Sequence, residues 1–114
     1  MFAVIQFVSN SDLYGDLSHL DKVKLAPTRE KAIEVMQSMA YDFIIDDLFD
    51  GDKGWAKSEN VTDFASAIEY LDKDCNRNDV GYVSIKASWH NNPFEVIFTF
   101  EEVEGCSTLS IVLI

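Results

Sequence analysis

The amino-acid sequence predicts an α+β domain in which two helices pack on one face of a mainly antiparallel sheet of four to five strands. Alternating apolar runs lie near both ends of the chain, and apolar residues at helical spacing fill its middle. The predicted order β(β)ααβββ segregates helices from most strands, as α+β folds do. With 114 residues, 47% of them hydrophobic, the chain is expected to form a single domain, residues 1–114, around its own core.

The first predicted strand covers residues 2–8, and both of its faces are largely apolar. Such a strand is expected to be central in its sheet or covered on both sides. After a polar loop over residues 9–20, residues 21–26 are predicted to form a short edge strand. Its lysines, Lys22 and Lys24, would protect the open edge against pairing with another chain.

The clearest predicted helix opens at Pro27 and Thr28, where Thr28 is a suitable N-cap. Apolar residues follow at helical spacing as far as Leu48. Gly51 and Gly54 come next, and glycines of this kind commonly end helices.

A second helix is predicted from about Thr62 to Lys73. Asn60 or Thr62 is a suitable N-cap, and Asp63 is favourable near the positive N-terminal end of the helix. The polar residues 72–79 are expected to form a turn.

The last third of the chain is predicted to be β-structure. Residues 81–89 alternate in polarity, with Trp89 on the same face as Val83, so Trp89 is expected in the core. A turn separates this strand from a second one over residues 94–103. Residues 108–114 are apolar and are predicted to form a final strand.

The net charge of −11 is unevenly distributed. Residues 42–79 contain eleven acidic and four basic residues, a net charge of −7. A negative field of this kind disfavours nucleic acid and anionic membranes as partners and favours a basic protein. No apolar run approaches the ~20 residues needed to cross a bilayer, and no signal peptide is recognised. Two widely spaced cysteines fit reduced thiols, so a cytoplasmic location is expected.

No catalytic or metal-binding motif is complete. With Gly51 at the glycine position of an EF-hand loop, Leu48 and Lys57 occupy positions that require oxygen ligands. The turn that begins at Asp72 places Arg77 where glycine is required. There is no glycine-rich phosphate loop and no His–Cys cluster at ligand spacing. We therefore expect no metal, no cofactor and no enzymatic activity.

Residues 42–52, which we call the acidic segment, are the most unusual part of the sequence. They contain five aspartates and no basic residue, on what is predicted to be the end of the first helix. Asp is a poor helix former, like charges four residues apart repel, and acids near a helix C-terminus oppose its dipole. A sequence that breaks several local rules at once often does so for function.

The spacing of these charges suggests mimicry of nucleic acid. If helical, the acidic segment spans roughly 16 Å. One DNA strand carries about five charges over that length, at one per ~3.4 Å. Trp55 follows at once, and Trp is over-represented in interface hot spots. The predicted partner-binding residues are Asp42, Asp46, Asp47, Asp50, Asp52, Trp55 and Glu59.

The sequence therefore favours an inhibitor that docks on the basic surface of a nuclease or another nucleic-acid-binding protein. Anti-restriction and anti-CRISPR proteins of phages and mobile elements work on this physical basis. Two alternatives stay open. One is an immunity protein against a nuclease toxin. The other is an assembly protein that forms a homodimer through the apolar strand Leu109–Ile114.

Overall fold

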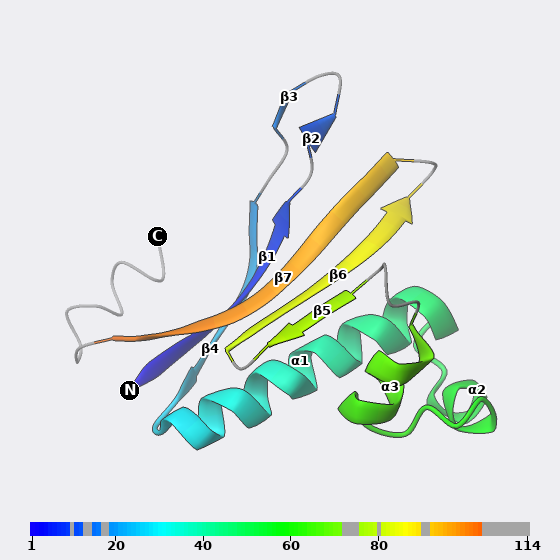
Figure 1. The fold of residues 1–114 in the computed structure, drawn as a ribbon, viewed down its shortest axis with the longest axis horizontal. Coiled ribbons are helices and arrows are strands. Elements are labelled where there is room, and N and C mark those ends of the chain that lie inside the picture. Colours follow the sequence, from blue (N-terminus) through cyan, green and yellow to red (C-terminus); the bar gives the residue numbers. More distant parts are fainter. Residues whose placement is uncertain are drawn as a thin grey trace.

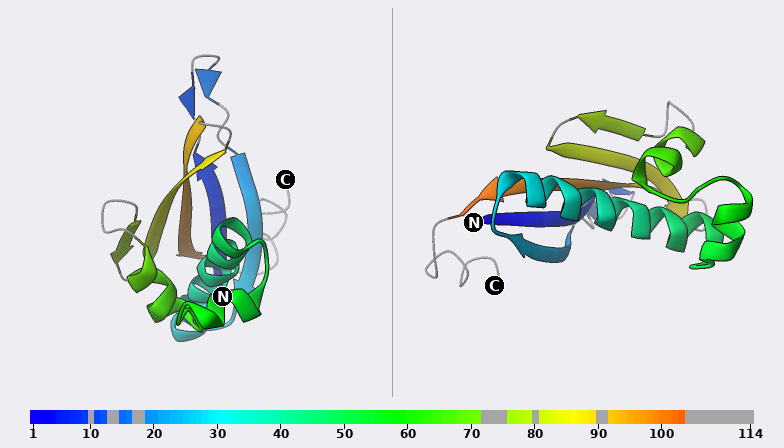
Figure 2. Two further views of the ribbon diagram at one scale, coloured as in Figure 1. Left: turned by 90° about the vertical axis from the view of Figure 1, so that its right-hand side faces the viewer. Right: turned by 90° about the horizontal axis from the view of Figure 1, so that it is seen from below.

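The computed structural model describes residues 1–9, 11–12, 15–16, 19–71, 76–79, 81–89 and 92–103. It confirms the α+β class. Five strands form one sheet, in which every strand pair is antiparallel. Figure 1 shows the helices packed against this sheet. Figure 2 shows the helices gathered on one side of the sheet.

The strands of the large sheet follow the order β4-β1-β7-β6-β5. β1 pairs with both β4 and β7, which confirms its predicted interior position. β4 lies at the edge, as predicted, and both of its lysines are exposed. A separate two-stranded sheet joins β2 to β3. The bounds are β1 Phe2–Ser9, β2 Ser11–Asp12, β3 Gly15–Asp16, β4 His19–Ala26, β5 Asn76–Asp79, β6 Tyr82–Trp89 and β7 Asn92–Glu102.

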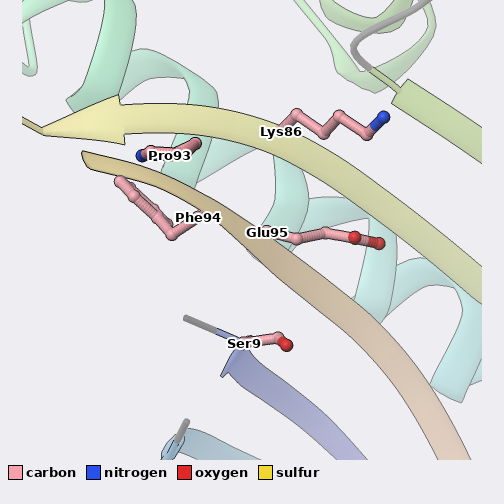
Figure 3. A pocket seen from close by; sticks show the side chains of 5 residues that line it. All are labelled: Ser9, Lys86, Pro93, Phe94 and Glu95. Atoms are coloured by element: carbon pink, nitrogen blue, oxygen red, sulfur yellow. The ribbon is translucent and has the colours of Figure 1, made fainter. Parts of the chain in front are cut away.

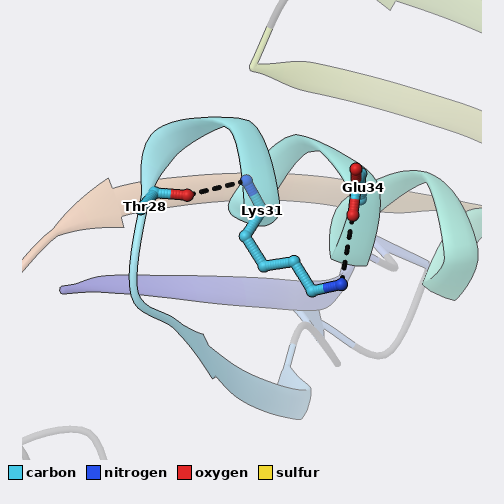
Figure 4. A network of polar contacts seen from close by, with 3 residues as sticks. All are labelled: Thr28, Lys31 and Glu34. Carbon is cyan, nitrogen blue, oxygen red and sulfur yellow. Dashed lines mark hydrogen bonds and ion pairs between the residues drawn. The ribbon is translucent and has the colours of Figure 1, made fainter.

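The long helix α1 covers Arg29–Phe49 and starts at the predicted cap. The hydroxyl oxygen of Thr28 accepts a hydrogen bond from the backbone N–H of Lys31 at 3.1 Å. The ammonium group of Lys31 in turn forms an ion pair with Glu34 at 3.1 Å (Figure 4). The cap satisfies one of the backbone donors that every helix start leaves unpaired.

The end of α1 differs from the prediction in one respect. Asp50 takes the left-handed conformation, with φ of 50°, and Gly51 follows with φ of 76°. The N–H of Gly51 donates to the carbonyl oxygen of Ile45 at 3.0 Å, which closes the helix. Gly54 does not take part, because it already lies in the next helix.

Two short helices follow where one was predicted. α2 covers Lys53–Ser58, and the carboxylate of Asp52 caps it. α3 covers Phe64–Tyr70. Its N-cap is Asp63 and not the predicted Asn60 or Thr62, because Asp63 and Ser66 bond reciprocally in a capping box. These hydrogen bonds, first from the backbone N–H and then from the hydroxyl of Ser66, lower the pKa of Asp63.

The last third contains one strand that the sequence did not indicate. Residues 76–79 of the expected turn form β5, which pairs with β6 at the sheet edge. The predicted strand over residues 108–114 and the side chain of Trp89 lie outside the part of the chain that the structure describes.

The core lies between the helices and one face of the sheet. Residues that pair across antiparallel strands share a face of the sheet. The strand register therefore places Val4, Phe98 and Val83 on one face, and all three belong to the core cluster that also contains the buried side chains of the helices. α1 contributes the largest share of the helical half. Its buried side chains are Ala32, Met36, Met39, Ala40, Ile44, Ile45 and Phe49.

A bulge in β4 accommodates a buried polar side chain. Gln6 in β1 is only 4% exposed. The register between β1 and β4 shifts after Gln6, so that Asp21 has no partner in the ladder. The amide nitrogen of Gln6 donates a hydrogen bond to the carboxylate of Asp21 at 2.9 Å, which satisfies the amide away from water.

Candidate docking surface

The acidic segment does not form one continuous helical ridge. Asp42, Asp46 and Asp47 lie in α1. Asp50 caps its C-terminal end in the left-handed conformation, and Asp52 begins α2. The prediction that all five aspartates share the end of one helix is therefore wrong, because the chain turns sharply at Asp50 and Gly51.

The three helical aspartates also do not share one face. At 3.6 residues per turn, Asp42 and Asp46 are only about 40° apart around the helix axis. Asp47 lies about another 100° further round. The charge density read along the sequence thus exceeds the density on any one side of α1.

The aspartates of the acidic segment are nevertheless available to a partner. Asp42, Asp46, Asp47 and Asp50 are exposed. Within the described residues, none of these four carboxylates forms a side-chain hydrogen bond or an ion pair. Partial burial of its carboxylate raises the pKa of Asp47.

Asp52 and Glu59 have local roles at the two ends of α2. The carboxylate of Asp52 accepts a hydrogen bond from the backbone N–H of Trp55 at 3.0 Å. Glu59 is the exposed C-cap residue, and its backbone N–H bonds back to the helix. Residues 42–59 contain six acidic and two basic residues, so the surface keeps a net charge of −4.

Trp55 belongs to an aromatic cluster formed with Phe49 and Tyr70. The rings of Phe49 and Trp55 meet edge to face, with centroids 5.3 Å apart. The ring of Tyr70 lies 5.5 Å from that of Phe49. Phe49 is buried, whereas Trp55 is 47% and Tyr70 49% exposed. The cluster therefore joins the end of α1 to α2 and α3 and presents two aromatic side chains to solvent.

Sequence reasoning did not identify Tyr70 or Leu48 as parts of this surface. Leu48 is 38% exposed and follows Asp47 directly. The sequence offered one signal for Tyr70. It directly precedes Leu71 and is not among the apolar positions that form the predicted buried face of the second helix, so its ring could be expected at the surface. Only the fold shows that its ring reaches Phe49.

Shallow hollows also lie elsewhere on the described part of the chain. One is lined by Ser9, Lys86, Pro93, Phe94 and Glu95 at one end of β1, β6 and β7 (Figure 3). Lys86 and Glu95 are cross-strand neighbours there, with no ion pair between them. A second hollow lies between α1, α3 and β5 and is lined by Gln37, Asp63, Phe64, Ala65, Ile68 and Asn78. In this second hollow, Asp63 is already engaged as a helix cap.

Among the described residues, no three His, Cys, Asp or Glu side chains are grouped so that they could hold a metal ion. None of the helices in the described ranges is long and apolar enough to cross a membrane. In comparisons with known proteins, no family model, no curated protein and no solved structure matches the chain.

Proposed function

We propose that the protein is a small acidic binding protein that docks on the basic nucleic-acid-binding surface of a partner and inhibits it. One observation carries the proposal: exposed aspartates without partners among the described side chains lie next to a half-exposed aromatic cluster. Carboxylates that form no internal ion pair are available to pair with the Lys and Arg residues of a partner.

The two parts of this surface have different energetic roles. Exposed charges chiefly raise the association rate, and each contributes little to affinity. A large aromatic side chain that becomes desolvated at the centre of an interface contributes much more. Trp55 is the proposed anchor, because its ring is held by Phe49 yet remains half exposed.

The partner that fits best is a nuclease or another nucleic-acid-binding protein with a groove rich in Lys and Arg. An inhibitor from a phage or mobile element, of the anti-restriction or anti-CRISPR type, fits this chemistry, and so does an immunity protein against a nuclease toxin. In either case we propose action in the cytoplasm without a cofactor, without direct binding to nucleic acid or membrane, and without catalysis.

Two matched double variants test the charge. Asp42→Asn/Asp46→Asn removes two carboxylates four residues apart in α1, and Glu30→Gln/Glu34→Gln removes two at the same spacing near the start of the same helix. Proteins captured from candidate hosts by the unmodified chain are titrated with each variant. The aspartate variant should bind roughly tenfold more weakly, at about 0.7 kcal/mol per exposed charge, while the glutamate variant should bind nearly normally.

Competition with double-stranded DNA completes the test. If the protein occupies a nucleic-acid groove, DNA should displace it from the captured partner, and more salt should weaken the complex. Equal binding of the two double variants, or a partner that binds DNA and this protein simultaneously, would contradict the proposal.

A further inference from the structure

The sheet has a second face, opposite the helices, on which apolar side chains gather. Strand register places Ile5 beside Val23, and it places Phe7 between Leu20 and Ile97. Ala3 lies beside Leu25 at the end of the same surface. We call this surface the open face; its apolar members are Ala3, Ile5, Phe7, Leu20, Val23, Leu25 and Ile97.

The open face is separate from the core. None of its apolar members belongs to the core cluster or packs against it. Leu20 is 49% and Leu25 is 41% exposed, Ile5, Phe7, Val23 and Ile97 are partly exposed, and Ala3 alone is buried. No described helix lies on this side of the sheet (Figure 2). Folded monomers rarely leave a contiguous apolar surface of this kind uncovered, because its burial is favourable by about 25 cal/mol per Å².

The charges on the open face disfavour a second copy of the chain as its cover. Along β7, Glu95 and Glu101 share the face of Ile97, one toward each end. Two open faces in contact would bring four such glutamates into one interface between molecules that each carry a net charge of −11. The basic residues of this face, Lys86 and Arg77, belong to β6 and β5, on the far side of β7 from the apolar residues of β1 and β4.

Residues 104–114 have an apolar composition that matches the apolar side chains of the open face. After Glu104 the sequence contains no acidic or basic side chain, and five of the six residues from Leu109 to Ile114 are aliphatic. The segment starts directly after Val103, whose N–H bonds to the carbonyl oxygen of Met1 at 2.9 Å. The last described residue, Val103, therefore lies beside Met1, two residues along β1 from Ala3 at one end of the open face.

The length of the segment is also sufficient. Eleven extended residues reach up to about 36 Å, whereas the rows from Ala3 to Phe7 cover only about 13 Å of β1. A covalently attached segment also has a high effective concentration, which a separate partner lacks. We propose that residues 104–114 of the same chain occupy the open face and cover its apolar rows.

A nitroxide spin label on Cys106 tests this proposal directly in solution. The label is attached to a Cys75→Ser variant, so that Cys106 is the sole thiol, and amide signals are recorded by NMR. We expect the amide signals of Ile5 and Ile97 to be lost, while those of Ala40 and Ile44 in α1, on the other side of the sheet, are largely retained. Equal retention of both sets would overturn the proposal.

A mixed sample separates the segment of the same chain from that of a second copy. Spin-labelled chains without isotope are mixed with ¹⁵N-labelled Cys75→Ser/Cys106→Ser chains that carry no spin label. The signals of Ile5 and Ile97 should then be retained. Their loss in the mixed sample would show that a second copy covers the face, and the proposal would be wrong.

A shortened chain provides an independent measurement. A chain of residues 1–104 should bind a hydrophobic dye with several-fold higher fluorescence than the 114-residue chain, because the open face becomes accessible. Replacing Ser107 and Ser110 with Ala in the 114-residue chain serves as the control and should leave the fluorescence unchanged. No gain on shortening, with a native circular dichroism spectrum, would count against the proposal.

Discussion

Asp47, although exposed, shows how partial desolvation changes the behaviour of a single carboxylate. Partial burial disfavours its charged form and raises its pKa above the ordinary value of 3.8. A carboxylate with a raised pKa in the folded state contributes stability at a pH below its unfolded pKa, and this contribution is lost as the pH rises through the folded pKa. At neutral pH, the charge of Asp47 therefore slightly opposes folding.

We predict that Asp47→Asn raises the free energy of unfolding slightly at pH 7, because it removes a partly desolvated charge. The advantage should vanish at a pH below the unfolded pKa, where Asp47 itself is neutral. Urea unfolding at neutral and at acid pH measures both effects. Asp42→Asn is the control in the same helix. A variant at position 47 that is less stable at pH 7 than the one at position 42 would refute the prediction.

The turn between α1 and α2 is determined by a non-glycine residue in an unfavourable conformation. Asp50 has φ of 50°, whereas Gly51 has φ of 76°, which glycine adopts without strain. Only residues with short polar side chains tolerate the left-handed region at modest cost. At this helix end, Gly51 suits the left-handed conformation, whereas Asp50 keeps a carboxylate there at some cost in stability.

We predict that Asp50→Gly stabilises the fold by about 1 kcal/mol, because glycine removes the left-handed strain at the helix end. Asp50→Asn removes the charge but keeps the strain, so it should change stability much less. Chemical denaturation of both variants checks the difference. Equal stability of the two would mean that charge and not conformation governs this position.

The sequence predicted elements well where apolar periodicity was long. The helix from Thr28 and the interior strand β1 follow from such patterns. β5 was not predicted, because its four residues, Asn76–Asp79, are polar and have low β-propensity. α2 was not predicted either, because six residues are too few for periodicity. Its cap by Asp52 is a local hydrogen bond, whereas the contact of Trp55 with Phe49 is a tertiary feature.

At the scale of the whole molecule, most negative charge is not neutralised internally. The net charge is −11, from 20 acidic and nine basic residues, and one of these bases, Lys31, pairs with Glu34. A field of one sign repels itself and opposes compact folding. The location of the acidic surface could be predicted from sequence, because charge is visible there. Its division between two helices and its aromatic neighbours could not, since they depend on the turn at Asp50 and on the packing around Phe49.

We predict that added sodium chloride stabilises the protein, because salt screens this repulsion. A gain of about 1 kcal/mol would raise the melting temperature by roughly 4 °C for a chain of this size. Asp42→Asn/Asp46→Asn should show a smaller rise over the same salt series. Thermal scans in dilute and in moderate salt measure both. A melting temperature that falls with salt would show that attractive pairs dominate.

The buried amide of Gln6 has a consequence for how β4 is aligned. An edge strand that slips by two residues keeps its alternation, so apolar pattern alone does not distinguish the native alignment from the slipped one. A slipped β4 would move Asp21 away and leave the amide of Gln6 without its partner, at a cost of about 1–3 kcal/mol. The bulge and its single hydrogen bond therefore favour the native register of β4 over registers that are shifted by two residues.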